Sequence, residues 1–147
     1  MRRAVVLAIA AACSRPPIAS CDDDLRGVYT AGPAAERWMV LDEGPALEAY
    51  ALFPDADGPA DLIAAPRVID VSRAPARGSA HGELRGTLHR RYMRGADSCD
   101  AELPIRVTRC AGDALDIELI DPAPPTQFAP CTWPAPGPSR MVRWRRE

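Results

Sequence analysis

Alternation of apolar and polar residues is the feature that most restricts the fold of this chain. It is clearest at residues 101–109 and 115–119, where Leu, Ile and Val occupy every second position and mostly charged or polar residues separate them. Successive side chains of a β-strand point to opposite faces, so each segment has one apolar and one polar face. Strands of this kind form antiparallel sheets that are packed on one side.

The same alternation predicts strands elsewhere, at residues 27–30, 38–41, 68–72, 84–92 and 142–145. Residues 45–53 fit either a helix that begins after Pro45 or a strand, and the surrounding strands favour the strand. Residues 54–66 contain Pro54, Pro59 and Pro66 and predict a long loop. The expected fold is all-β: an antiparallel meander of about seven or eight strands, a closed or partly open barrel with long Pro-rich loops.

The hairpin that joins residues 101–109 to 115–119 has a predicted register. A three-residue loop at Ala111-Gly112-Asp113 places Val107 opposite Ile117, so that apolar residues share one face. A two-residue loop would place Val107 opposite Glu118 and bury a carboxylate. The apolar pattern therefore favours the first register.

The five cysteines constrain the chain further. Cys99 and Cys110 flank one strand and would lie ~36 Å apart in an extended chain. A disulfide needs Cα atoms within about 7 Å, which excludes that pair. The same hairpin brings Cys99 near the loop that carries Cys131. We therefore expect disulfides Cys99–Cys131 and Cys21–Cys110.

The N-terminus is typical of an export signal. Met1-Arg2-Arg3 is basic and residues 4–12 are apolar, a run too short to span a bilayer, which needs about 20 residues. We expect a signal peptide over residues 1–20, or one that ends at Ala12, followed by a single β domain over residues 21–147. Export places the domain in an oxidising compartment, where disulfides form.

Two cysteines near this signal resemble the lipidation site of bacterial lipoproteins. Ile18-Ala19-Ser20-Cys21 resembles the lipobox, and Ala10-Ala11-Ala12-Cys13 is a looser match that directly follows the apolar run. Lipid on Cys13, or secretion without lipid after cleavage before Cys21, leaves four cysteines for two disulfides. Lipid on Cys21 leaves three and strands one thiol. Cys13 is therefore the expected lipidation site and Cys21 the alternative. A lipid would make the membrane a partner of the exported protein, in the periplasm or cell envelope.

A second resemblance concerns the fold. Gly27-x-Tyr29 followed by a meander resembles the opening of lipocalin-type barrels, in which Trp is usual at the position of Tyr29. This resemblance implies a barrel with a ligand cavity.

Catalytic and metal-binding motifs are not found in the sequence. On one strand, His81 and His89 would lie too far apart to hold one metal ion. Asp70 is a conceivable general base but more often marks an edge strand. We expect no catalytic residues, no metal, no cofactor and no enzyme activity. All 18 basic residues are Arg, which reflects codon bias first and is weak evidence for nucleic-acid recognition. The net charge of -2 indicates no strongly acidic or basic partner, and we expect no nucleic acid.

Two other features have a functional and a structural interpretation. Arg85, Arg91, Arg143 and Arg145 would form a basic patch for anionic groups, or a solvated outer face balanced by Asp116 and Glu118. The proline-rich residues 122–138 resemble a polyproline ligand, but a stiff loop across one end of the sheet is favoured.

These observations favour a non-catalytic cell-envelope lipoprotein or secreted binding or structural domain, whose protein or small-ligand partner the sequence does not identify. Two alternatives are a lipocalin-like carrier, which requires an apolar interior cavity, and a secreted hydrolase inhibitor that presents residues 122–138.

Overall fold

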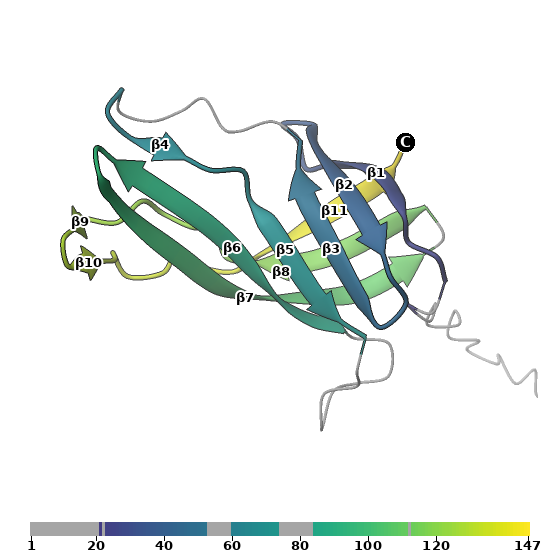
Figure 1. The fold of residues 1–147 in the computed structure, drawn as a ribbon. Helices are drawn as coiled ribbons and strands as arrows, with labels where there is room; N and C mark the ends of the chain where they lie inside the picture. The colour runs from purple at the N-terminus through teal and green to yellow at the C-terminus, as the bar shows by residue number, and fades with distance from the viewer. Residues whose placement is uncertain (1–20, 22, 53–59, 74–83, 112) are drawn as a thin grey trace, which may run out of the picture.

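A computed structural model describes residues 21, 23–52, 60–73, 84–111 and 113–147 (Figure 1). All regular elements in these residues are strands. They are β1 (Gly27–Ala31), β2 (Glu36–Asp42), β3 (Ala46–Ala51), β4 (Ile63–Ala64), β5 (Val68–Ser72), β6 (Leu84–Arg94), β7 (Asp97–Ala111), β8 (Ala114–Leu119), β9 (Gln127–Phe128), β10 (Cys131–Thr132) and β11 (Arg140–Arg146).

Eight strands form a closed antiparallel barrel in the order β1-β2-β3-β5-β6-β7-β8-β11, and β11 pairs with β1 to close it. The short strand β4 pairs with β6 beyond the start of β5, and β9 pairs with β10 outside the barrel. The predicted all-β meander barrel is confirmed, and residues 45–53 contain a strand, β3, as expected. The short strands β4, β9 and β10 lie in segments that the sequence predicts as loops.

The β7–β8 hairpin has the predicted register with a tighter turn. Val107 lies opposite Ile117, and Ala111 lies opposite Ala114. A register shift between Val107 and Arg109 absorbs one residue, as a β-bulge does. The apolar residues therefore remain on the inner face although the turn is shorter than expected.

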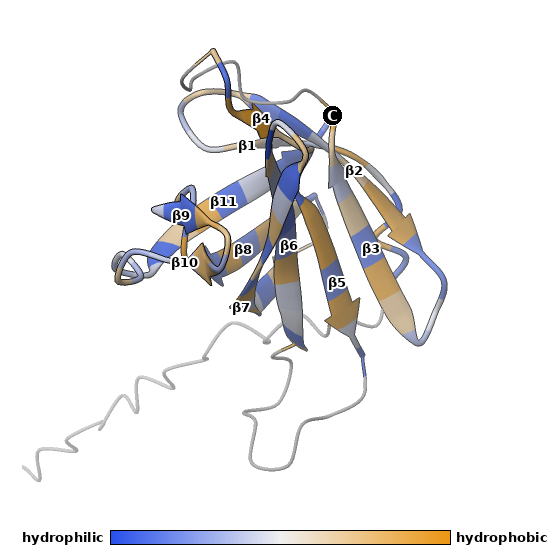
Figure 2. Ribbon diagram, turned by 60° about the vertical axis from the view of Figure 1, so that its left-hand side comes forward, coloured by the Kyte–Doolittle hydropathy of each residue, from blue (hydrophilic) through white to orange (hydrophobic). Residues whose placement is uncertain are grey.

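The interior of the barrel is filled by side chains, and the apolar stripes of the strands are visible in Figure 2. Trp38 and Trp144 are each 1% exposed and their rings lie 4.6 Å apart between centroids. Tyr29 packs on Trp144 at 6.4 Å. The buried Arg67 lies over the ring of Trp38, with its Cζ 5.2 Å from the ring centroid, and forms an ion pair with Glu36 at 2.8 Å.

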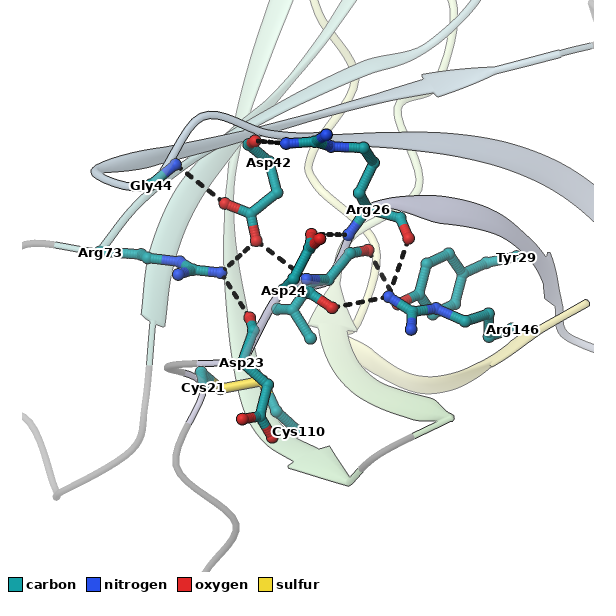
Figure 3. A network of polar contacts seen from close by, with 11 residues as sticks. Cys21, Asp23, Asp24, Arg26, Tyr29, Asp42, Gly44, Arg73, Cys110 and Arg146 are labelled. Atoms are coloured by element: carbon teal, nitrogen blue, oxygen red, sulfur yellow. Dashed lines mark hydrogen bonds and ion pairs between the residues drawn. A yellow bond between two sulfur atoms is a disulfide. The ribbon is translucent and has the colours of Figure 1, made fainter.

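The barrel has two different ends. We call the end where β1 begins and β2 ends the capped end, because residues 23–26 cross it (Figure 3). Arg73 donates to the carbonyl of Asp23, and Arg146 donates to the carbonyls of Asp24 and Arg26. The opposite end, which carries the loops after β3, β6 and β8, is the loop end.

Asp42 is the centre of the network at the capped end. Its side chain is 5% exposed, accepts hydrogen bonds from the backbone N–H groups of Leu25 and Gly44 at 2.9 Å, and forms an ion pair with Arg73. Burial acts to raise the pKa of this carboxyl, but the two backbone hydrogen bonds and Arg73 outweigh it and lower the pKa. The charged carboxylate therefore holds the N-terminal segment against the barrel.

The lowered pKa of Asp42 predicts acid-sensitive stability. The pKa of Asp42 is lower in the folded protein than in the unfolded chain, where it is about 3.9. The resulting stabilisation is fully present above the unfolded pKa and is lost as the pH falls through the folded pKa. Asp42→Asn should cost about 1–3 kcal/mol at pH 7, because Arg73 loses its charged partner. Urea unfolding should show that the free energy of unfolding falls less between pH 7 and about pH 3 in the variant than in the wild type. The exposed Asp97→Asn is the control, and equal stability of Asp42→Asn and wild type at pH 7 would contradict the prediction.

Two disulfides join the expected cysteines. Cys21 pairs with Cys110 at a Cα distance of 5.2 Å, and Cys99 pairs with Cys131 at 5.8 Å. The first bond ties the N-terminal segment to the end of β7 at the capped end. The second ties the start of β7 to β10 at the loop end.

Candidate functional site

A groove opens beside β7 at the loop end of the barrel. β7 pairs with β6 from Asp97 to Val107, but it pairs with β8 only from Arg106 onward. β8 ends at Leu119, and residues 120–123 and 133–137 line the space beside residues 100–103 of β7. The resulting groove has a volume of about 440 Å³, within the range of ligand pockets.

The groove has apolar walls and an exposed aromatic residue. Ala101 and Leu103 of β7 form one wall, and Ile120 and Pro122 belong to the opposite wall. Trp133 lies in the lining and is 37% exposed, whereas Trp38 and Trp144 are buried. Residues 134–137, of the sequence Pro-Ala-Pro-Gly, complete the lining.

Covalent and polar contacts hold the far wall in place. The buried Tyr92 hydroxyl donates to the carbonyl of Pro122 at 2.6 Å, and its ring lies 6.1 Å from that of Trp133. The Cys99–Cys131 disulfide fixes the chain two residues before Trp133. Figure 1 shows β9 and β10 beside the tip of the β6–β7 hairpin. These contacts preform the groove without a ligand.

The charged residues in the groove lining are acidic: Asp100, Glu102 and Asp121. Arg91 donates two hydrogen bonds to Asp100 and lowers the pKa of its carboxyl. Arg140 does the same for Asp121. The side chain of Glu102 is 70% exposed, and its Oε1 lies 3.7 Å from Nδ1 of His89. Of the three groove carboxylates, Glu102 is therefore the one for which no described arginine forms an ion pair.

The predicted basic patch does not form a continuous surface. Arg85 and Arg91 lie on β6, whereas Arg143 and Arg145 lie on β11, and β7 and β8 separate these strands. Arg91 is paired with Asp100, and Arg143 is paired with Asp116. The interpretation as an outer face balanced by acidic residues therefore describes Arg91 and Arg143.

Other candidate residues are placed as follows. Asp70 points outward and its Oδ2 lies 3.0 Å from Nε2 of His89, whose Nδ1 faces Glu102. The two ring nitrogens of His89 thus face the carboxylates of Asp70 and Glu102 on an exposed surface. This arrangement does not place His89 as a base for a Ser, Thr or Cys nucleophile. Cys13 and His81 lie outside the described residues, while Cys21 is in a disulfide.

Two further features are absent from the described residues. These residues contain no cluster of three or more His, Cys, Asp or Glu side chains placed to hold a metal ion. They also contain no helix long and apolar enough to cross a membrane. No known protein family matches the chain, and no similar protein was found among curated sequences or solved structures.

The groove is the site that sequence reasoning missed. One signal could have indicated it: Pro104 lies within the alternating segment of β7. Proline within a strand is confined to sheet edges, strand starts and bulges. Pro104 therefore indicates that β7 lacks a partner on one side, although its alternation resembles that of a central strand.

Proposed function

We propose that this protein is an exported, non-catalytic binding protein of the cell envelope, anchored by lipid on Cys13, and that the groove beside β7 is its binding site. The observation that carries the proposal is the preformed groove with Trp133 exposed in it. A large aromatic side chain held half-exposed by a disulfide-braced loop is typical of a binding surface.

The disulfides support export and the choice of Cys13. Two buried or loop-bracing disulfides are the pattern of proteins in oxidising compartments. The sulfur of Cys21 is bonded to Cys110 and cannot also form a thioether to a lipid. The basic and apolar residues 1–12 supply the export signal, directly before Cys13.

Intact mass of the mature protein tests the anchor. The full chain is produced in a bacterial host that processes lipoproteins, and its membrane fraction is analysed. We expect a diacylated chain that begins at Cys13 and gains about 4 Da on reduction, since each disulfide takes up two hydrogens. Cys13→Ser should abolish the adduct. An unmodified chain that begins near residue 21 would contradict the anchor and indicate a secreted protein.

Fragment screening by NMR tests the groove. We expect weakly binding small-molecule fragments to shift the amide signals of Ala101 and Leu103 and the indole signal of Trp133. Trp133→Ala should weaken the binding of these fragments about tenfold or more, because the aromatic side chain in the groove lining is lost. Met141→Ala, at an apolar residue that is 56% exposed elsewhere on the barrel, is the matched control. Fragments that bind only outside the groove would contradict the proposal.

The two alternative functions differ in where they place the partner. The eight-stranded barrel is compatible with a carrier, but Tyr29, Trp38 and Trp144 occupy its interior, so a carrier would have to use the groove. Hydrolase inhibition is favoured as the second candidate by the exposure of residues 129–139, in a segment braced by the Cys99–Cys131 disulfide. An inhibitor would lose its effect on a target enzyme when the tip of this segment is changed, with the fragment site intact.

A further inference from the structure

We propose that the groove accepts an extended peptide segment of another protein, which joins the barrel as an added strand along the free edge of β7. The segment has an apolar–basic–apolar sequence, with its basic residue beside Glu102. This inference rests on the proposed function and identifies the ligand of the same site.

The backbone groups that would bind the segment can be identified from the sheet. The N–H of Ala65 donates to the carbonyl of Arg91 at 2.8 Å, so the backbone of Arg91 faces β4 and not β7. Arg91 lies opposite Asp100 in the β6–β7 ladder. Directly opposed residues of an antiparallel ladder either bond to each other or both face away. The backbone groups of Asp100 therefore face away from β6, into the groove.

The alternation of the ladder extends this result along β7. The backbone groups of every second residue in a strand point to the same side. Glu102 and Pro104 lie two and four positions after Asp100, so their backbone groups also face the groove. Pro104 agrees with this assignment, because its missing N–H falls on the unpaired side and costs no ladder bond. The free edge thus offers the N–H groups of Asp100 and Glu102 and the carbonyls of all three residues.

A free sheet edge favours an extended polypeptide over other ligands. Closed barrels otherwise have no edge, and an open one is a template for another strand. Peptide segments bind such edges through main-chain hydrogen bonds, while alternate side chains enter pockets. The acidic side chains and Pro104 protect this edge against indiscriminate pairing, and they also restrict which segment can bind.

Cross-strand geometry fixes the sequence of the segment. The side chain opposite Glu102 lies on the outer face, where a Lys or Arg would meet a carboxylate that no arginine neutralises among the described residues. The residues on either side point inward like Ala101 and Leu103, toward Ile120 and Trp133. Apolar side chains fit those two positions.

Fluorescence anisotropy with labelled peptides tests the proposal. The probe is a seven-residue peptide, Ser-Thr-Val-Lys-Val-Thr-Ser, blocked at both ends. Replacing its Lys by Glu should weaken binding tenfold or more. In Glu102→Gln, the affinities of the Lys and Glu peptides should differ by no more than about threefold. This substitution removes the charge pair but keeps the backbone N–H of residue 102. Equal affinity of the Lys and Glu peptides for the wild type would overturn the basic specificity.

Backbone methylation tests strand addition itself. One peptide carries an N-methyl group on Lys and the other on the following Val. Adjacent amides of a strand point in opposite directions, so one methylation should weaken binding tenfold or more and the other should not. Glu102→Pro should weaken binding of the unmethylated peptide tenfold or more as well, because it removes the N–H of residue 102. Circular dichroism checks that the variant is folded. Equal binding of both methylated peptides would overturn strand addition.

These outcomes separate the inference from the proposed function. If fragments bind in the groove and depend on Trp133 but no peptide binds, the peptide inference fails and the groove remains a binding site. If neither binds there, both fail. Self-association through β7, detected by sedimentation and lost in Glu102→Pro, would identify a second copy as the occupant and overturn the proposal of a different protein.

Discussion

Trp144→Ala is expected to lower the free energy of unfolding by about 3–5 kcal/mol, a large part of the 5–15 kcal/mol that stabilises a typical domain. Trp144 is 1% exposed and contacts Trp38 from β2 and Tyr29 from β1. It lies on β11, whose pairing with β1 closes the barrel. Removing the indole leaves a cavity at this closure and takes away both aromatic contacts.

Equilibrium urea unfolding, followed by far-UV circular dichroism, measures this loss. Trp133→Ala is the matched control: the same substitution at a 37% exposed position should cost well under half as much. Comparable losses in the two variants would mean that the Trp38–Trp144 contact does not organise the interior. The contrast also separates stability from ligand binding, because only Trp133 lines the groove.

Removing the Cys21–Cys110 disulfide should destabilise the protein more than removing Cys99–Cys131. The two bonds join residues separated by 89 and 32 positions. Restriction of the unfolded chain predicts stabilisation of about 4.6 and about 3.7 kcal/mol for loops of these lengths, as upper values. The first bond also holds the capped end, where Asp42, Arg73 and Arg146 depend on the position of residues 23–26.

Double alanine variants test this order without leaving a free thiol. Cys21→Ala with Cys110→Ala is compared with Cys99→Ala with Cys131→Ala by urea unfolding of oxidised protein. The second pair should have the larger effect on the groove, since Cys131 braces the wall that carries Trp133. A larger loss of stability in the second pair would contradict the chain-restriction argument.

Much of the barrel could be predicted because its strands alternate apolar side chains on the inner face with polar side chains on the outer face. Val107 and Ile117 share the inner face, and that requirement alone selected the register of the β7–β8 hairpin. The cysteine pairs followed from this register and from the length of β7. The turn at Ala111 was less predictable, since a bulge and a shorter turn satisfy the same apolar pattern.

Apart from the signal at Pro104, the candidate site could not be predicted, because it arises from unequal strand lengths. β7 extends from Asp97 to Ala111, whereas β8 stops at Leu119 after six residues. The sequence marks where each alternation ends, but not how the chain between residues 120 and 139 returns past the uncovered part of β7. Similarly, Arg85 and Arg143 have similar patterns in the sequence but lie on strands that two others separate.

The pairing of β1 with β11 also sets an order in time. A chain that is made, or threaded through a membrane, from its N-terminus presents Arg140–Arg146 after all the other strands of the barrel. Until those residues emerge, β1 and β8 each lack one neighbour, and Tyr29 and Trp38 lack the ring of Trp144. The barrel can therefore close only after Arg140–Arg146 have emerged, so every earlier intermediate has unpaired edges on β1 and β8.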